Sequence, residues 1–208
     1  MTLFPNTPQV TRNILIINIL FFAATLLGER TLNSVGMSWF ALYPPGSPNF
    51  RWWQFVTYMF MHGGFWHIFF NMYTLWVFGS MVERIIGPRK FVLLYGIGGV
   101  GAAMFHIAVT NLLGGAGVPM VGASGAIYGL LVAYAMLFPN SRMTLIFPPV
   151  TLSAKWMVVA FAFIELFTGV VGTAEGIAHF AHLGGMIVGM LLLMIWKKEG
   201  KLFNQQWW

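Results

Sequence analysis

Six long apolar stretches divide the chain, and most of its charged residues lie at the ends of these stretches or outside them. A bilayer core about 30 Å thick requires about 20 helical residues, and backbone exposed to lipid must form its hydrogen bonds internally. The pattern therefore predicts an all-α fold, a polytopic membrane protein built as a bundle of six transmembrane helices. The expected spans are about 12–28, 66–84, 90–111, 123–138, 153–171 and 176–196.

Two connections between the spans are unusual. Residues 29–65 are rich in Trp, Phe, Tyr and Pro, so we expect short elements that lie in the membrane interface. Residues 112–122 carry no charge and lead directly to Ser124. The chain shows no internal repeat and no second domain, so residues 1–208 are interpreted as one membrane-embedded domain with short ends.

The positions of the cations predict the orientation of the spans. If the spans alternate in direction, nine Lys and Arg residues fall on one side: Arg12, Arg84, Arg89, Lys90, Arg142, Lys155, Lys197, Lys198 and Lys201. Only Arg30 and Arg51 fall on the other side. Cytoplasmic loops carry an excess of Lys and Arg, so both ends of the chain are expected in the cytoplasm. The expected location is the inner membrane of a bacterium. The first residues lack the features of a secretory signal, and the first span is expected to be retained.

Composition supports a membrane protein and excludes several chemistries. The chain is 58% hydrophobic and 8% charged, whereas globular domains carry about 25% charged residues. Its net charge of +6 is spread between the apolar runs, which argues against a nucleic-acid partner. The sequence contains no Cys and no Asp, which excludes cysteine nucleophiles, thiolate metal sites, two-aspartate proteases and a Ser-His-Asp triad.

Polar residues are predicted to gather at one depth of the membrane. Spans two, four and six all enter from the outer side, and each carries polar side chains near that end: His67 and Asn71, Ser124, and His179 and His182. Polar residues inside a membrane are costly and are commonly functional. Polar residues that converge from three helices are stronger evidence for a functional site than any one of these residues alone.

The spacing of small residues predicts which helices approach most closely. Span four has Gly125 and Gly129, and span six has Ala181, Gly185 and Gly189, each set at intervals of four. Small residues at this interval let transmembrane backbones pack tightly. Such packing would bring Ser124 within reach of His182, and Tyr128 could pack against the imidazole.

A serine hydroxyl needs an adjacent base to act as a nucleophile, and His182 is the candidate base. Candidate oxyanion donors are the Ser124 backbone N–H, His67 and Asn71, together with the positive end of a helix dipole. Because the sequence lacks Asp, we expect packing and hydroxyl groups to orient the imidazole. The sequence assigns no role to Glu165 or His179. His106 is expected to be an interior histidine whose ring nitrogens have hydrogen-bond partners.

These motifs, in this order, resemble the rhomboid family of intramembrane serine proteases over about residues 10–196. The family pattern HxxxN matches His67 and Asn71, GxSG matches Gly122, Ser124 and Gly125, and AHxxG matches Ala181, His182 and Gly185. The tyrosine four residues after the serine is Tyr128. One departure is visible, because the first-loop pair WR of the family aligns with Trp53 and Gln54.

The resemblance implies a six-helix rhomboid bundle with a water-filled cavity that is open to the outside. It implies a Ser124–His182 dyad, an oxyanion site that uses His67 and Asn71, and mobile elements near span five that admit substrate. The expected partners are transmembrane protein substrates and membrane lipids, and neither a cofactor nor a metal is expected.

Five alternatives compete with this interpretation. Ser124 could simply cap its helix, and His67 and Asn71 could be structural hydrogen-bonding residues. Glu175, His179 and His182 share a helix face that could bind a metal. The whole protein could be a catalytically silent membrane-helix-binding member with a quality-control role. It could also be a small transporter, although such folds often contain repeats that this chain lacks.

Overall fold

The chain folds mainly into helices, and the computed structural model describes residues 6–27, 32–114, 118–145, 149–171 and 178–200. Its helices are α1 (Gln9–Leu27), α2 (Leu32–Phe40), α3 (Gln54–Thr57), the 3-10 turn η1 (Tyr58–Phe60), α4 (Phe65–Thr74), the π-helical turn η2 (Leu75–Gly79), α5 (Ser80–Ile86), α6 (Pro88–Leu112), α7 (Ser124–Leu137), α8 (Ala154–Val171) and α9 (His179–Lys198). The strands β1 (Arg142–Thr144) and β2 (Thr151–Ser153) form an antiparallel pair, with Arg142 opposite Ser153. The expectations that involve Glu175, Arg30 and Lys201 lie outside the described residues.

Helix lengths separate the membrane-crossing elements into two groups. Among the described residues, α1, α6, α8 and α9 are long and apolar enough to cross a bilayer, whereas α7 has only 14 residues. The predicted second span is a continuous helical run in which α4 and α5 are joined through η2. The predicted helical class is therefore confirmed, while the hydrophobic pattern did not predict the β1–β2 pair.

Local sequence explains how two of these helices meet and how α1 is held. Gly87 ends α5 with a φ of +81°, a conformation that glycine adopts easily, and Pro88 begins α6 at a position where its missing N–H is harmless. The buried carboxylate of Glu83 on α5 accepts the backbone N–H groups of Val10 and Thr11 at 3.0 and 2.7 Å. A negative charge at a helix N-terminus is stabilising, so Glu83 anchors α1 to α5.

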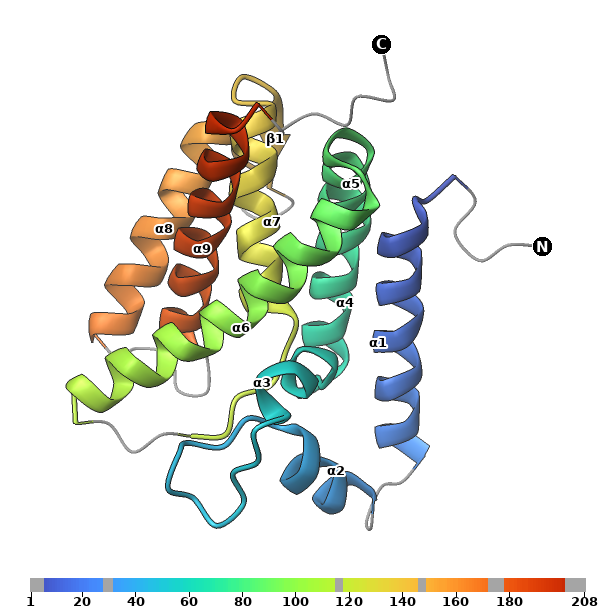
Figure 1. Ribbon diagram of the computed structural model, residues 1–208, viewed down its shortest axis with the longest axis vertical. Coiled ribbons are helices and arrows are strands. Elements are labelled where there is room, and N and C mark those ends of the chain that lie inside the picture. The colour runs from blue at the N-terminus through green and yellow to red at the C-terminus, as the bar shows by residue number, and fades with distance from the viewer. Residues whose placement is uncertain (1–5, 28–31, 115–117, 146–148, 172–177, 201–208) are drawn as a thin grey trace.

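In the bundle, α7 lies between α9 and the α4–α5 run, while α6 crosses the bundle obliquely (Figure 1). The helices α1 and α8 form opposite edges, and α1 begins at the same end of the bundle at which α9 ends (Figure 1). Ten of the fourteen residues of α7 are buried. The short central helix is thus surrounded by protein, and the longer helices provide the outer surface.

Glycines permit the close contact between α7 and α9. A Cβ atom added at Gly185 would overlap the backbone carbonyl of Gly125, and one at Gly189 would lie 2.7 Å from Gly129 Cα. These neighbours are backbone atoms, which cannot rotate away. The two helices therefore touch backbone to backbone along the stripe that the sequence predicts.

The aromatic connection before α4 contains the short elements that the sequence predicts, namely α2, α3 and η1. Gln54, which stands where the family pattern has Arg, is fully buried at their centre. Its amide nitrogen donates to the carbonyls of Ser38 and Asn49, and its oxygen accepts the N–H groups of Tyr43 and Arg51 at 3.3 and 3.1 Å. One neutral side chain thus connects four backbone groups of this segment, and no arginine is needed at this position.

Replacing Gln54 with Ala is expected to lower the free energy of unfolding by at least about 2 kcal/mol, because it leaves buried backbone groups without partners. Thermal unfolding in detergent, followed by circular dichroism, measures this loss. The exposed Gln9 provides the matched control, since Gln9→Ala should change stability by less than about 0.5 kcal/mol. Equal stability of the two variants would contradict this account of the segment.

Candidate active site

The short helix α7 begins beside a large cavity. A 14-residue helix is about 21 Å long, well below the bilayer core of about 30 Å, so α7 by itself is too short to reach across such a core. A cavity of about 700 Å³ lies against its first residue, Ser124, and is also lined by His67, Asn71, Tyr128 and His182. The segment 118–122 and parts of α4, α6, α8 and α9 supply the remaining walls.

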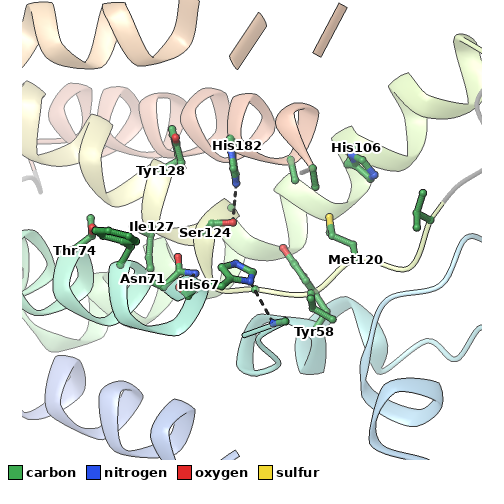
Figure 2. A pocket seen from close by; sticks show the side chains of 18 of the residues that line it. Tyr58, His67, Asn71, Thr74, His106, Met120, Ser124, Ile127, Tyr128 and His182 are labelled. Carbon is green, nitrogen blue, oxygen red and sulfur yellow. Dashed lines mark hydrogen bonds between the residues drawn. The ribbon is translucent and has the colours of Figure 1, made fainter. Parts of the chain in front are cut away.

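Ser124 and His182 point toward each other across the wall of this cavity (Figure 2). Ser124 Oγ and His182 Nε2 lie 2.8 Å apart, which is a hydrogen-bond distance. Ser124 does not cap its helix: Ala123 occupies the N-cap position, and no side-chain capping bond forms there. The capping alternative is therefore wrong.

Tyr128 fixes the plane of the imidazole. Its ring stacks on that of His182 with centroids 4.3 Å apart and planes only 7° from parallel. Tyr128 lies one turn after Ser124 on α7, so the same helix carries both the hydroxyl and the ring that supports its partner.

His67 and Asn71 lie on the other side of Ser124 from His182 (Figure 2). The backbone N–H of Gly63 donates to His67 Nδ1 at 3.3 Å, which assigns the proton of a neutral His67 to Nε2. That nitrogen faces Gly122, where an added Cβ would lie 2.7 Å from it and where φ is +122°. The Asn71 amide donates to the His67 carbonyl at 3.0 Å. Gly122 thus makes room for a His67 N–H beside the serine.

His62 is a buried neighbour of His67 that precedes α4. The two rings meet edge to face with centroids 5.1 Å apart. Burial, and to a smaller extent the nearby His67, lower the pKa of His62 to about 3. His62 is therefore neutral at physiological pH and places no charge next to His67.

A carboxylate, which the sequence analysis did not assign, lies behind His182. Glu165 on α8 has Oε1 3.0 Å from His182 Nδ1 and Oε2 2.6 Å from His179 Nδ1. The Tyr128 hydroxyl donates to Oε1 at 2.5 Å. The imidazole is thus contacted by a carboxylate as well as by the packed Tyr128 ring, and the expectation of packing and hydroxyl groups did not include this carboxylate. The sequence did contain one indication of this role, because Glu165 is a charged residue within a predicted membrane span.

The metal-binding alternative would also involve a different carboxylate. Glu175 lies outside the described residues, whereas ligand atoms of Glu165, His179 and His182 lie within 4.8 Å of one another. Two ligands of a tetrahedral zinc ion lie about 3.3 Å apart, given bonds of about 2.0–2.1 Å. The N–O separations of 2.6 and 3.0 Å match hydrogen bonds and ion pairs better than shared coordination.

His106 on α6 differs from the expected interior histidine. It lines the cavity, to one side of Ser124 (Figure 2). Within the described part of the chain, its Nδ1 has no hydrogen-bond partner. The expectation of an interior residue with all its hydrogen bonds made was wrong. His106 faces the cavity, and the hydrophobic pattern of α6 does not reveal that this cavity exists.

This arrangement can support acyl transfer. A hydroxyl is hydrogen-bonded to an imidazole, the imidazole is backed by a carboxylate, and N–H donors lie on the far side of the hydroxyl. Ser124 is also the first residue of α7, so its backbone N–H lacks an intrahelical acceptor and lies at the positive end of the helix.

Comparisons with known proteins point to one family. The Rhomboid domain model matches residues 49–199. The chain is 31% identical over 161 residues to the putative rhomboid protease YdcA of Bacillus subtilis, covering 76% of this chain and 74% of that protein. It is 34% identical over 140 residues to Rhomboid protein 1, mitochondrial, of Saccharomyces cerevisiae, covering 64% of this chain. It is also 34% identical over 149 residues to the mouse presenilin-associated rhomboid-like protein, mitochondrial, covering 69% of this chain. The chain spans only 38% of the yeast protein and 39% of the mouse protein.

Proposed function

Because this chain belongs to the rhomboid family, we propose that it is a serine endopeptidase that cleaves other membrane proteins within or beside their transmembrane segments. The observation that carries the proposal is the 2.8 Å contact between Ser124 Oγ and His182 Nε2 at the wall of a large cavity. A catalytically silent member would have no need of this pair, and neither would a transporter.

In the proposed mechanism, His182 Nε2 removes the proton of Ser124 as Oγ attacks the carbonyl carbon of the substrate. The tetrahedral oxyanion accepts hydrogen bonds from the Ser124 backbone N–H, from His67 Nε2 and from the Asn71 amide. The imidazolium then gives its proton to the leaving amine, and the acyl group remains on Ser124. A water molecule, deprotonated by His182, releases this acyl group and restores the serine.

The substrate is a transmembrane helix whose end enters the cavity. A helical peptide bond is already hydrogen-bonded and shielded, so the segment must unwind before Ser124 can reach it. Small residues at the cleaved bond and helix-destabilising residues beyond it should therefore favour cleavage.

The protein is a multi-pass membrane protein, and we place it in a bacterial inner membrane with six spans and both ends in the cytoplasm. The start of α1 and the end of α9 lie at the same end of the bundle (Figure 1), and this arrangement and the nine cations predicted on one side support this orientation. In this orientation, Ser124 lies below the outer surface of the membrane.

The function is tested by incubating the purified protein with a single-span model substrate in detergent and in liposomes. Two fragments are expected, with the cut mapped by mass spectrometry near the outer end of the span. A fluorophosphonate should label one residue, Ser124, and labelling should be lost in His182→Ala. An intact substrate together with an unlabelled Ser124 would favour a silent helix-binding member. A label on another serine would show that this other serine, and not Ser124, is the nucleophile.

A further inference from the structure

The carboxylate of Glu165 is almost fully enclosed, with 7% of the residue exposed, yet it lies in the middle of a membrane-embedded helix. An isolated carboxylate there would be strongly destabilising, and such groups persist only when they are paired and hydrogen-bonded. Glu165 is paired on both oxygens, with His182 and Tyr128 at Oε1 and with His179 at Oε2. These partners offset the free-energy cost of burying the charge. A buried charge inside a membrane-embedded helix is also commonly functional.

The contacts form an ordered series from the serine to the carboxylate. Ser124 Oγ meets His182 Nε2 at 2.8 Å, and the opposite ring nitrogen, Nδ1, meets Glu165 Oε1 at 3.0 Å. A carboxylate next to Nδ1 holds the proton on that nitrogen, which leaves the lone pair of Nε2 free to accept the serine proton. It also stabilises the imidazolium that forms when the proton moves.

From this series we infer that Glu165 is a positioning residue, the third member of a Ser124–His182–Glu165 arrangement. The inference rests on the proposed function and extends it beyond a serine–histidine pair. The Nδ1 contact is at ion-pair distance but departs from the direction of a well-aligned hydrogen bond. The attraction between two charges depends on their distance more than on direction. The contact therefore stabilises the protonated form of the His182 ring more than the neutral form.

Two neighbours keep the carboxylate in place. Tyr128 stacks on the His182 ring and donates to Glu165 Oε1 at 2.5 Å, so one side chain supports both partners. His179 holds the second oxygen at 2.6 Å, and the Thr168 hydroxyl lies 3.1 Å from the same His179 nitrogen. Oε1 is thereby directed toward His182, one turn along α9 from His179.

A purely structural connection between α8 and α9 would produce the same contacts, so the test must separate stability from turnover. The test compares Glu165→Gln, which keeps the shape and removes the charge, with Glu165→Asp, which keeps the charge on a shorter stem. We expect Glu165→Gln to lower kcat by about 100-fold or more with KM changed less than about threefold. Glu165→Asp should recover at least about tenfold of that loss. The labelling rate of Ser124 by a fluorophosphonate should follow the same order.

Glu83→Gln is the matched control, because it removes another buried carboxylate that anchors α1 and does not line the cavity. It should lower the melting temperature and leave kcat unchanged. Wild-type kcat and labelling in folded Glu165→Gln would overturn the inference. So would losses that track the melting temperature, or wild-type activity that is abolished by EDTA and restored by zinc, which would make the cluster a metal site. A wild-type protein that neither cleaves nor labels would instead overturn the proposed function itself.

Discussion

Replacing Ser124 with Ala is expected to lower the rate of substrate cleavage by at least about 10⁴-fold, because the variant retains the oxyanion donors but has no nucleophile. Its hydroxyl is hydrogen-bonded to His182 and forms no helix cap, so its removal should leave the fold intact. The measurement is the rate of fragment formation by purified protein in liposomes, with circular dichroism to establish folding.

The same experiment with His182→Ala should give a loss of similar size, and the double variant should be no worse than either single one. Residues that act as one unit show this non-additivity, whereas independent residues would multiply their effects. Ser153→Ala is the control and should retain full activity, because Ser153 lies in strand β2 opposite Arg142, which follows the C-terminal end of α7. Substantial turnover in folded Ser124→Ala would remove Ser124 from the mechanism.

Replacing Gly185 with Ala is expected to lower the free energy of unfolding by about 3 kcal/mol or more, the upper end of the usual range for overpacking. The new methyl group would overlap the Gly125 carbonyl, so α7 and α9 must separate. Gly185 lies one turn from His182, and this separation also lengthens the 2.8 Å contact with Ser124. Activity should therefore fall further than stability alone explains.

Gly96→Ala makes the same chemical change in helix α6, where an added Cβ meets nothing within 4 Å. It should leave stability unchanged or raise it by up to about 1 kcal/mol, because alanine favours helix more than glycine. Titration of mixed micelles with SDS, followed by circular dichroism, compares the two variants. A Gly185→Ala protein as stable as Gly96→Ala would show that α7 and α9 do not pack backbone to backbone at Gly185 and Gly125.

Much of the site could be predicted from sequence because its members follow helical spacing. His67 and Asn71 are four residues apart on one helix, and Ser124 begins the next apolar run that enters from the same side. The glycine stripes on α7 and α9 predicted which helices would touch. The long apolar runs likewise predicted a multi-pass helical protein, since lipid leaves the backbone few other choices.

The carboxylate behind His182 and the amide at the centre of the first loop were decided only by tertiary structure. Glu165 lies 17 positions before His182, and no period links residues on two different helices. Gln54 joins four backbone groups that local sequence does not mark. The sequence by itself determined which side chains share a helix face. Which faces meet, and at what distance, was set by the packing of whole helices, because contact between helices depends on the shape of both.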